Sequence, residues 1–265
     1  MTWPGGLYIV GKMNFDISHL LDGWEYEPGQ IVVRRFKTKA GVEKIQLRVD
    51  LGVLQLNLAG RPDGKRPYGR ESLLEYYESR LRRYLKTHEG KDDGFKLSAS
   101  DCAKLQQEAV QFHHRYICLF QLQDYVGVLR DTARNLKVYE LMRQYVASEE
   151  LLLPLQHLVP QLLMMQTRAQ GMTAVDQGDF ALATRCVEDG VDTVRNFFRD
   201  HGRGDMADTS AEVQSLEAFL RDIQSTRPLT RREKLQRTLD EAVRREDYEK
   251  AAEVRDILRG LRPRG

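Results

Sequence analysis

From residue 98 almost to its end, the chain places apolar residues at the three- and four-residue spacing of amphipathic helices. Only very short turns separate these stretches, each of which is roughly 15 to 25 residues long. Consecutive helices joined by short turns pack against each other in antiparallel fashion. This region is therefore expected to fold as antiparallel helix pairs, and only the residues before it leave room for a sheet.

Strand-like alternation is confined to residues 13–70. Residues 31–36 and 44–49 alternate apolar and polar positions on either side of a turn centred on Gly41, which predicts a β-hairpin. Residues 51–58 alternate again and predict a third strand.

Three antiparallel strands with one apolar face need a helix to cover that face. The neighbouring helical patterns at residues 16–21 and 71–87 are the expected covers. The fold class is therefore α+β and mostly α, with a small antiparallel sheet near the N-terminus.

The overall composition is that of a soluble globular protein. The 265 residues are 30% charged and 41% hydrophobic with a formal net charge of +2, which does not indicate a nucleic-acid or membrane binder. Pro154 and Pro160 interrupt the longest apolar run, so it cannot supply the roughly 20 residues of a membrane span. Residues 1–12 have the character of a loose leader without signal-peptide layout, and we expect a cytoplasmic protein.

No arrangement of residues indicates catalysis or metal binding. Cys102, Cys118 and Cys186 are odd in number and far apart, which argues for buried thiols rather than disulfides. His113-His114 and Cys118 can share a helix face, but a zinc site needs three or four ligands. We therefore expect no metal, no cofactor and no enzymatic activity. An active site assembled from scattered residues remains an alternative.

The loop at residues 60–72 is rich in turn formers and basic side chains. Its spacing does not fit the phosphate-binding P-loop, because Arg66 stands where Ser or Thr would hold magnesium. The loop is read either as a solvated connection or as an anion or nucleic-acid contact. In the second case the contact residues are Arg61, Lys65, Arg66 and Arg70.

Two of the predicted interhelical turns are alike. Each ends in an acidic and an aromatic residue, Asp124-Tyr125 and Asp179-Phe180, which can cap the next helix and fill the elbow. Gly178-Asp179-Phe180 with Ala183 resembles the helix–turn–helix unit of tetratricopeptide repeats, although the two turns lie farther apart than the repeat length of about 34 residues. The resemblance implies a groove for a peptide or a partner helix.

The composition changes at residues 224–234, where Pro228 disfavours a continuous helix. The predicted organisation has four parts. These are a leader at 1–12, a small α+β domain at 13–90, a helical-repeat-like domain at 98–224, and a linker with a helical hairpin at 225–265.

The C-terminal segment predicts two short helices. Tyr248 is expected to lean into the elbow, and Arg255 is expected to pair with Glu246 or Asp247 across the turn. A hairpin this small shields only part of its apolar surface, since lone domains below about 40 residues usually need help. It must therefore dock on its own body, on a second copy or on a partner. The expected docking residues are Leu235, Leu239, Val243, Tyr248, Ala251, Ala252, Arg255, Leu258 and Leu261.

A set of residues in this segment resembles the UVR motif: Leu235, Leu239, Ala242-Val243, Glu246-Asp247-Tyr248-Glu249, Ala251-Ala252, Arg255-Asp256-Ile257 and Leu261. That motif ends the B component of the excinuclease and recurs in its C component, in some Clp-type ATPases and in the activator of the protein arginine kinase, with Phe more usual at the position of Tyr248. The resemblance implies a bacterial protein and a hairpin that binds another UVR hairpin or a cognate surface, a homodimer included. Helicase and nuclease motifs and the cysteine-rich zinc modules of the kinase activator are missing.

From Arg227 to the end there are 12 Lys or Arg and 8 Asp or Glu, interleaved along both helices, which is typical of a solvated face rather than of a DNA-binding one. The leading hypothesis is therefore a non-enzymatic adaptor or scaffold in DNA repair or regulated proteolysis. It would bind partner proteins through the hairpin and the helical body. The alternative is a nucleic-acid-binding accessory protein that uses the loop at 60–70.

Overall fold

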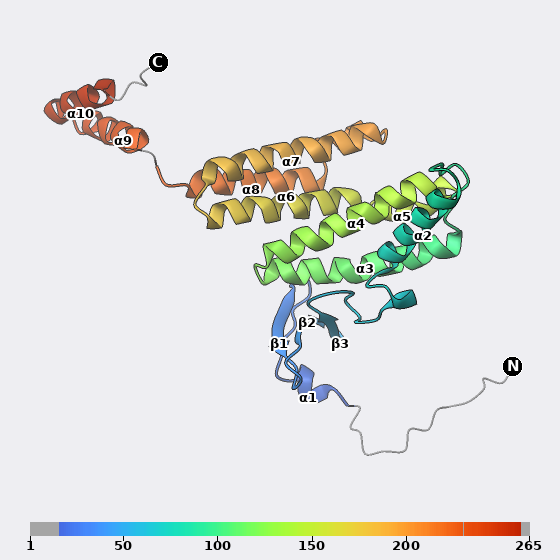
Figure 1. The fold of residues 1–265 in the computed structure, drawn as a ribbon. Coiled ribbons are helices and arrows are strands. Elements are labelled where there is room, and N and C mark those ends of the chain that lie inside the picture. Colours follow the sequence, from blue (N-terminus) through green and yellow to red (C-terminus); the bar gives the residue numbers. More distant parts are fainter. Residues whose placement is uncertain (1–15, 230, 261–265) are drawn as a thin grey trace.

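The computed structural model describes residues 16–229 and 231–260. These ranges form a mostly helical molecule with a small sheet near one end of the chain and a separate helix pair at the other (Figure 1). The leader predicted for residues 1–12 lies outside the described residues. The elements in chain order are α1 (Ser18–Leu21), β1 (Val32–Lys37), β2 (Glu43–Val49), β3 (Gly52–Asn57), α2 (Leu73–Thr87), α3 (Ala99–Gln121), α4 (Tyr125–Tyr145), α5 (Leu153–Gln156), α6 (Val159–Asp176), α7 (Phe180–Asp200), α8 (Ala211–Thr226), α9 (Arg231–Arg244) and α10 (Tyr248–Gly260).

The three predicted strands are confirmed as an antiparallel sheet in the order β1-β2-β3. Its register places Ile45 opposite Leu56. It also places Leu47 between Val33 on β1 and Leu54 on β3. Directly opposed residues share a face of the sheet, so this register gathers the apolar side chains on one side.

The expected covers of that face are wrong. Ile45 and Leu56 are buried in one cluster with Tyr116 and Leu119 of α3, so a helix of the body covers the sheet. The helix α1 has only four residues and buries none of them. The division of the chain after residue 90 stays a prediction.

The helix α2 packs on the helical body. Its Leu73 and Tyr77 share a cluster with Leu105 of α3 and Met142 of α4. The predicted helix at 71–87 is thus confirmed, but its apolar face serves the helical core.

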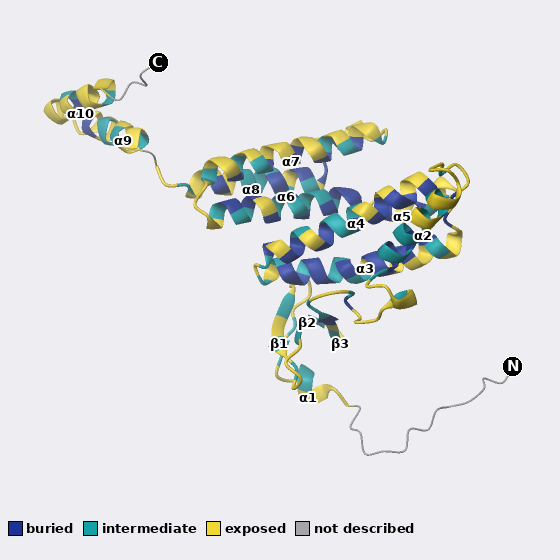
Figure 2. Ribbon diagram, viewed as in Figure 1, coloured by how far each residue is buried: buried dark blue, intermediate teal, exposed yellow. Residues whose placement is uncertain are grey.

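A buried ion pair joins the middle of α3 to α4. Arg115 and Asp131 are each 1% exposed, and their side chains form a bidentate pair at 2.6 and 2.8 Å. The Nη1 of Arg115 also donates to the carbonyls of Asn57 (2.9 Å) and Gly60 (2.7 Å) at the end of β3. One guanidinium therefore fixes two helices and the exit of the sheet. Figure 2 shows the buried stripe along α3 and α4 in which this pair lies.

A second buried acid anchors α2. Both carboxylate oxygens of Glu108 accept from the backbone N–H of Leu73, at 2.8 and 3.0 Å, and the side chain pairs with Arg61 and Arg134. Because a carboxylate is favoured at a helix N-terminus, Glu108 holds the start of α2 against α3. Burial lowers the pKa of Arg134 to about 9, and the positive charge of Arg61 contributes to the same shift.

The same turn closes three helix pairs. It contains a residue in the left-handed region, followed by an aspartate whose side chain caps the next helix. Gln123, Gly178 and Glu246 have φ of 59°, 76° and 58°. The aspartates after them, Asp124, Asp179 and Asp247, accept from the N–H groups of Gly127, Leu182 and Lys250. Their own N–H groups donate to the carbonyls of Leu119, Ala174 and Ala242, at 2.9 Å in all three turns.

Side chains cap the starts of two helices of the body. Ser98 and Asp101 form a capping box at the start of α3. Ser210 caps α8 and accepts from the N–H of Val213 at 3.2 Å.

Two neighbouring histidines in α3 predict a loss of stability in acid. Burial lowers the pKa of His113 to about 4, with a smaller effect of His114, and burial also lowers the pKa of His114. The Nδ1 of His113 lies 2.6 Å from the hydroxyl of Tyr116. Between pH 6.5 and about 4 the unfolded chain binds a proton that the folded chain does not. The stability from His113 is therefore complete above pH 6.5 and is lost as the pH falls toward 4.

The measurement is urea unfolding of the wild type and His113→Gln at pH 7 and pH 4.5. We expect the wild type to lose more stability than the variant over this interval. His88→Gln, at an exposed position, is the control and should follow the wild type. Parallel pH dependence of wild type and His113→Gln would contradict the assignment.

Candidate functional site

The basic loop after β3 places most of its charge against carboxylates. Arg61 is 13% exposed and pairs with Asp63 at 3.1 Å and with Glu108 at 3.5 Å. Arg66 and Arg70 lie 3.4 Å from Glu71 and 3.6 Å from Glu75. Lys65 is exposed. These pairs reduce the positive potential that the four predicted contact residues could offer an anion.

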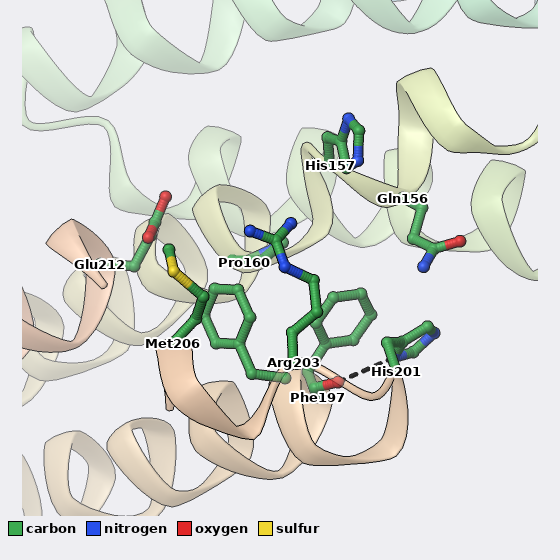
Figure 3. Close-up of a pocket in the computed structure, with 9 residues that line it drawn as sticks. Gln156, His157, Pro160, Phe197, His201, Arg203, Met206 and Glu212 are labelled. Atoms are coloured by element: carbon green, nitrogen blue, oxygen red, sulfur yellow. Dashed lines mark hydrogen bonds between the residues drawn. The ribbon is translucent and has the colours of Figure 1, made fainter. Parts of the chain in front are cut away.

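A pocket of about 230 Å³ lies between the start of α6 and the end of α7 (Figure 3). Both ring nitrogens of one of its histidines, His201, already have hydrogen-bond partners within the protein. His201 Nδ1 lies 2.7 Å from the carbonyl of Phe197 and therefore donates to it, and His201 Nε2 accepts from the hydroxyl of Tyr139 at 2.9 Å. These two contacts connect the end of α7 to α4, so His201 acts as a structural link. Arg203, Met206 and Glu212 are among the other residues that line the pocket.

The three thiols, two on α3 and one on α7, and the two histidines of α3 contribute to packing. Cys102 and Cys118 are fully buried and Cys186 is half-buried, as free thiols. Desolvation raises the pKa of Cys118 to about 12. Within residues 16–229 and 231–260, no cluster of three or more His, Cys, Asp or Glu side chains could hold a metal ion.

None of the helices in these two ranges combines the length and apolar character needed to cross a bilayer.

The C-terminal segment forms the predicted helical hairpin, α9–α10, beyond the end of α8 (Figure 1). Its interior is narrow, because the buried residues are Ala242, Ala251 and Val254. Small side chains at the contact let two helices approach closely. Sequence analysis did not identify Val254, although its three-residue spacing from Ala251 places it on the same helix face.

A shallow hollow of about 590 Å³ is lined by residues of both α9 and α10 and is here called the hairpin groove. Val243 is 52% and Tyr248 is 68% exposed there. The groove contains six of the nine predicted docking residues. It is lined by Leu239, Asp240, Val243, Tyr248, Ala251, Ala252 and Arg255.

Two of the other predicted docking residues do not line the groove. Leu235 and Leu258 are half-buried, and Leu261 lies outside the described residues. Asp240, which sequence analysis did not include, adds an acidic group to the wall of the groove.

Two expected contacts within the hairpin are wrong. Tyr248 faces solvent instead of filling the elbow, because the left-handed residue Glu246 and the Asp247 cap already close the turn. The guanidinium of Arg255 lies 3.5 Å from its neighbour Asp256 instead of crossing the turn. Both side chains therefore border the groove, where Arg255 is 53% exposed.

The groove has one charge of each sign. Asp240 accepts from the Nε2 of Gln236 at 3.0 Å, and Arg255 lies on the other helix. The other side chains that line the groove are mainly apolar and include Leu239, Val243 and Ala251. Surfaces that combine apolar area with charges of both signs are typical of protein–protein contacts.

The comparisons with known proteins concern this hairpin. No curated protein and no solved structure matches the chain. One motif does match, over the segment that contains both helices of the hairpin. It is the UvrB/uvrC motif, UVR, and it matches residues 230–262.

Proposed function

We propose that this protein is a non-enzymatic adaptor that docks a partner protein through the α9–α10 hairpin. The observation that carries the proposal is the hairpin groove, whose Val243 and Tyr248 are exposed on a UVR motif. UVR motifs mediate protein interactions, which agrees with this use of the groove.

The energetics support an external partner. Ala242, Ala251 and Val254 are the buried residues of the hairpin. Burying a large apolar side chain contributes roughly 1.5–3 kcal/mol, and alanines contribute less, so this interior stabilises the hairpin only weakly. Covering Val243 and Tyr248 with a partner would add stability that the hairpin cannot supply itself. The proposed partner carries a UVR hairpin or a cognate surface, and a second copy of this chain is one such partner.

The helical body is proposed to bind a second protein, so that the chain connects two partners. DNA repair and regulated proteolysis in the cytoplasm are the proposed settings, because UVR hairpins occur in excinuclease components and in some Clp-type ATPases. The tetratricopeptide-like character of residues 98–224 is part of this proposal.

The test compares proteins captured in cells by the full chain, by a chain ending at Ser225 and by Val243→Glu. A carboxylate at position 243 would have to be desolvated by any apolar partner, so we expect both altered chains to lose the same protein. Glu253→Lys is the matched control, because Glu253 is exposed on the same hairpin and does not line the groove. Capture of the same proteins by all four chains would contradict a docking role for the hairpin.

One observation favours the alternative of a nucleic-acid-binding accessory protein. A hollow of about 370 Å³ beside α2 is lined by Arg80, Arg83 and Lys96 and by the half-buried ring of Tyr84, and Arg80 also pairs with Asp101 at 3.3 Å. A group of cations beside an accessible aromatic ring is typical of single-strand contacts. The test is fluorescence anisotropy of labelled single-stranded DNA at 50 and 200 mM salt, with Arg83→Ala/Lys96→Ala as the variant. Salt-sensitive binding that the variant lacks would favour this function.

A further inference from the structure

The α6–α7 and α9–α10 hairpins share one turn geometry. The α6–α7 hairpin can therefore be compared with the hairpin groove position by position. In both turns an aspartate N–H donates to an alanine carbonyl at 2.9 Å, Asp179 to Ala174 and Asp247 to Ala242. The same turn with the same cap fixes the relative positions of the two helices that it joins. The two hairpins can thus be aligned residue by residue from these aspartates.

Aligning Asp179 with Asp247 places each residue of the groove opposite a residue of the helical body. The pairs are Gly171 with Leu239, Met172 with Asp240, Val175 with Val243, Phe180 with Tyr248, Ala183 with Ala251, Thr184 with Ala252 and Val187 with Arg255.

In five of the seven pairs the residue of the hairpin is more exposed than its counterpart in the helical body. Val187 is fully buried in α7, whereas its counterpart Arg255 is 53% exposed. Val175 is half-buried, whereas Val243 is 52% exposed. A third helix makes the difference, because α8 packs on both α6 and α7 (Figure 1).

One side chain shows how α8 occupies the groove of α6–α7. A Cβ atom on Gly171 would lie 2.8 Å from the ring of Phe219 and 3.1 Å from Val187, so the Phe219 ring fills the space above Gly171. The rest of the buried stripe of α8 has helical spacing and consists of Val213, Leu216 and Ile223. A single amphipathic helix is therefore sufficient to close a hairpin of this construction.

We propose that the hairpin groove binds one amphipathic helix of a partner protein in the place that α8 takes on α6–α7. This inference rests on the proposed docking function and specifies its ligand. Leu239 stands at the position of Gly171, where a side chain would meet a ring placed like that of Phe219, and Arg255 stands at the position of Val187. The docked helix therefore carries a carboxylate where α8 carries Phe219, flanked by apolar residues at the positions of Leu216 and Ile223.

The probe is a synthetic peptide with the sequence of residues 208–227 and the substitution Phe219→Glu, titrated into the full chain by calorimetry. The comparison peptide carries Phe219→Lys. We expect saturable binding of the Glu peptide and at least about 10-fold weaker binding of the Lys peptide, because Arg255 attracts a carboxylate and repels an ammonium group. In the Arg255→Glu chain the preference should reverse. Val243→Glu should abolish the binding of both peptides, and the control Glu253→Lys should leave both unchanged.

Absence of binding, or equal binding of both peptides by the wild type and by Arg255→Glu, would overturn the inference. Sedimentation velocity separates the competing occupant. A dimer that Val243→Glu dissociates and the peptides do not would mean that a second hairpin fills the groove. That result would contradict the single-helix ligand but not the docking function. If Val243→Glu left the proteins captured in cells unchanged, both the docking function and the single-helix ligand would be contradicted.

Discussion

Replacing Asp131 by alanine is expected to lower the free energy of unfolding by about 3–5 kcal/mol. The substitution leaves the guanidinium of Arg115 buried at 1% exposure without its bidentate partner. The same guanidinium donates to the carbonyls of Asn57 and Gly60. If Arg115 shifts, the attachment of the end of β3 to α3 is therefore weakened as well. A buried charge without a counter-charge costs far more than the packing of one removed carboxylate.

Urea unfolding at pH 7, followed by circular dichroism, measures this loss. The matched control is Arg130→Ala. The Arg130 side chain pairs with the same carboxylate at 2.8 Å but is 49% exposed, so its removal should cost less than about 1 kcal/mol. Equal losses for Asp131→Ala and Arg130→Ala would show that burial does not govern this network.

Replacing Ala242 by aspartate is expected to unfold the hairpin and to leave the helical body folded. Ala242 is 4% exposed between α9 and α10, and a carboxylate there would be buried without a partner. An unpaired buried polar group costs roughly 1–3 kcal/mol. Because the hairpin buries so few side chains, we expect this cost to exceed its free energy of folding. Docking through the groove should disappear with the fold of the hairpin.

Hydrogen exchange followed by mass spectrometry distinguishes local from global unfolding. Amides of residues 231–260 should exchange as in an unfolded chain, while those of α3, α4 and α6–α8 keep their protection. Glu241→Ala is the control, since Glu241 is exposed beside Ala242 and does not line the groove. Loss of protection in α8 as well would mean that the hairpin and the body fold as one unit.

The elements of this fold follow from its sequence more closely than their contacts do. Apolar alternation predicts the three strands, and helical periodicity predicts the helices from α2 onward. Periodicity could not predict which helix packs on the sheet, because the apolar face of the sheet that contains Ile45 can pack against any apolar helix face of similar size. Its partner Tyr116 is distant in sequence. The pairing of Arg115 with Asp131 was hidden for the same reason, since it depends on which sides of α3 and α4 face each other.

The hairpin illustrates the limit of periodicity within a single element. Ala251 and Ala242 are inside, as their size and spacing predict. Val254 and Arg255 follow Ala251 by three and four residues, and both spacings point to the same side of a helix. Only the position of α9 decides that Val254 faces inward and Arg255 faces the groove. The residues that border a docking surface are therefore the hardest to separate from the interior.

The connection between α8 and α9 contains only residues 227–230. At about 3.5 Å per residue, even a fully extended connection spans no more than roughly 15–20 Å. Any molecule seated on the hairpin is thus tethered near the C-terminal end of α8. Short tethers of this kind give effective concentrations in the millimolar range. A second contact between the helical body and the same assembly can therefore be too weak to detect in isolation and still be almost fully occupied in the complex.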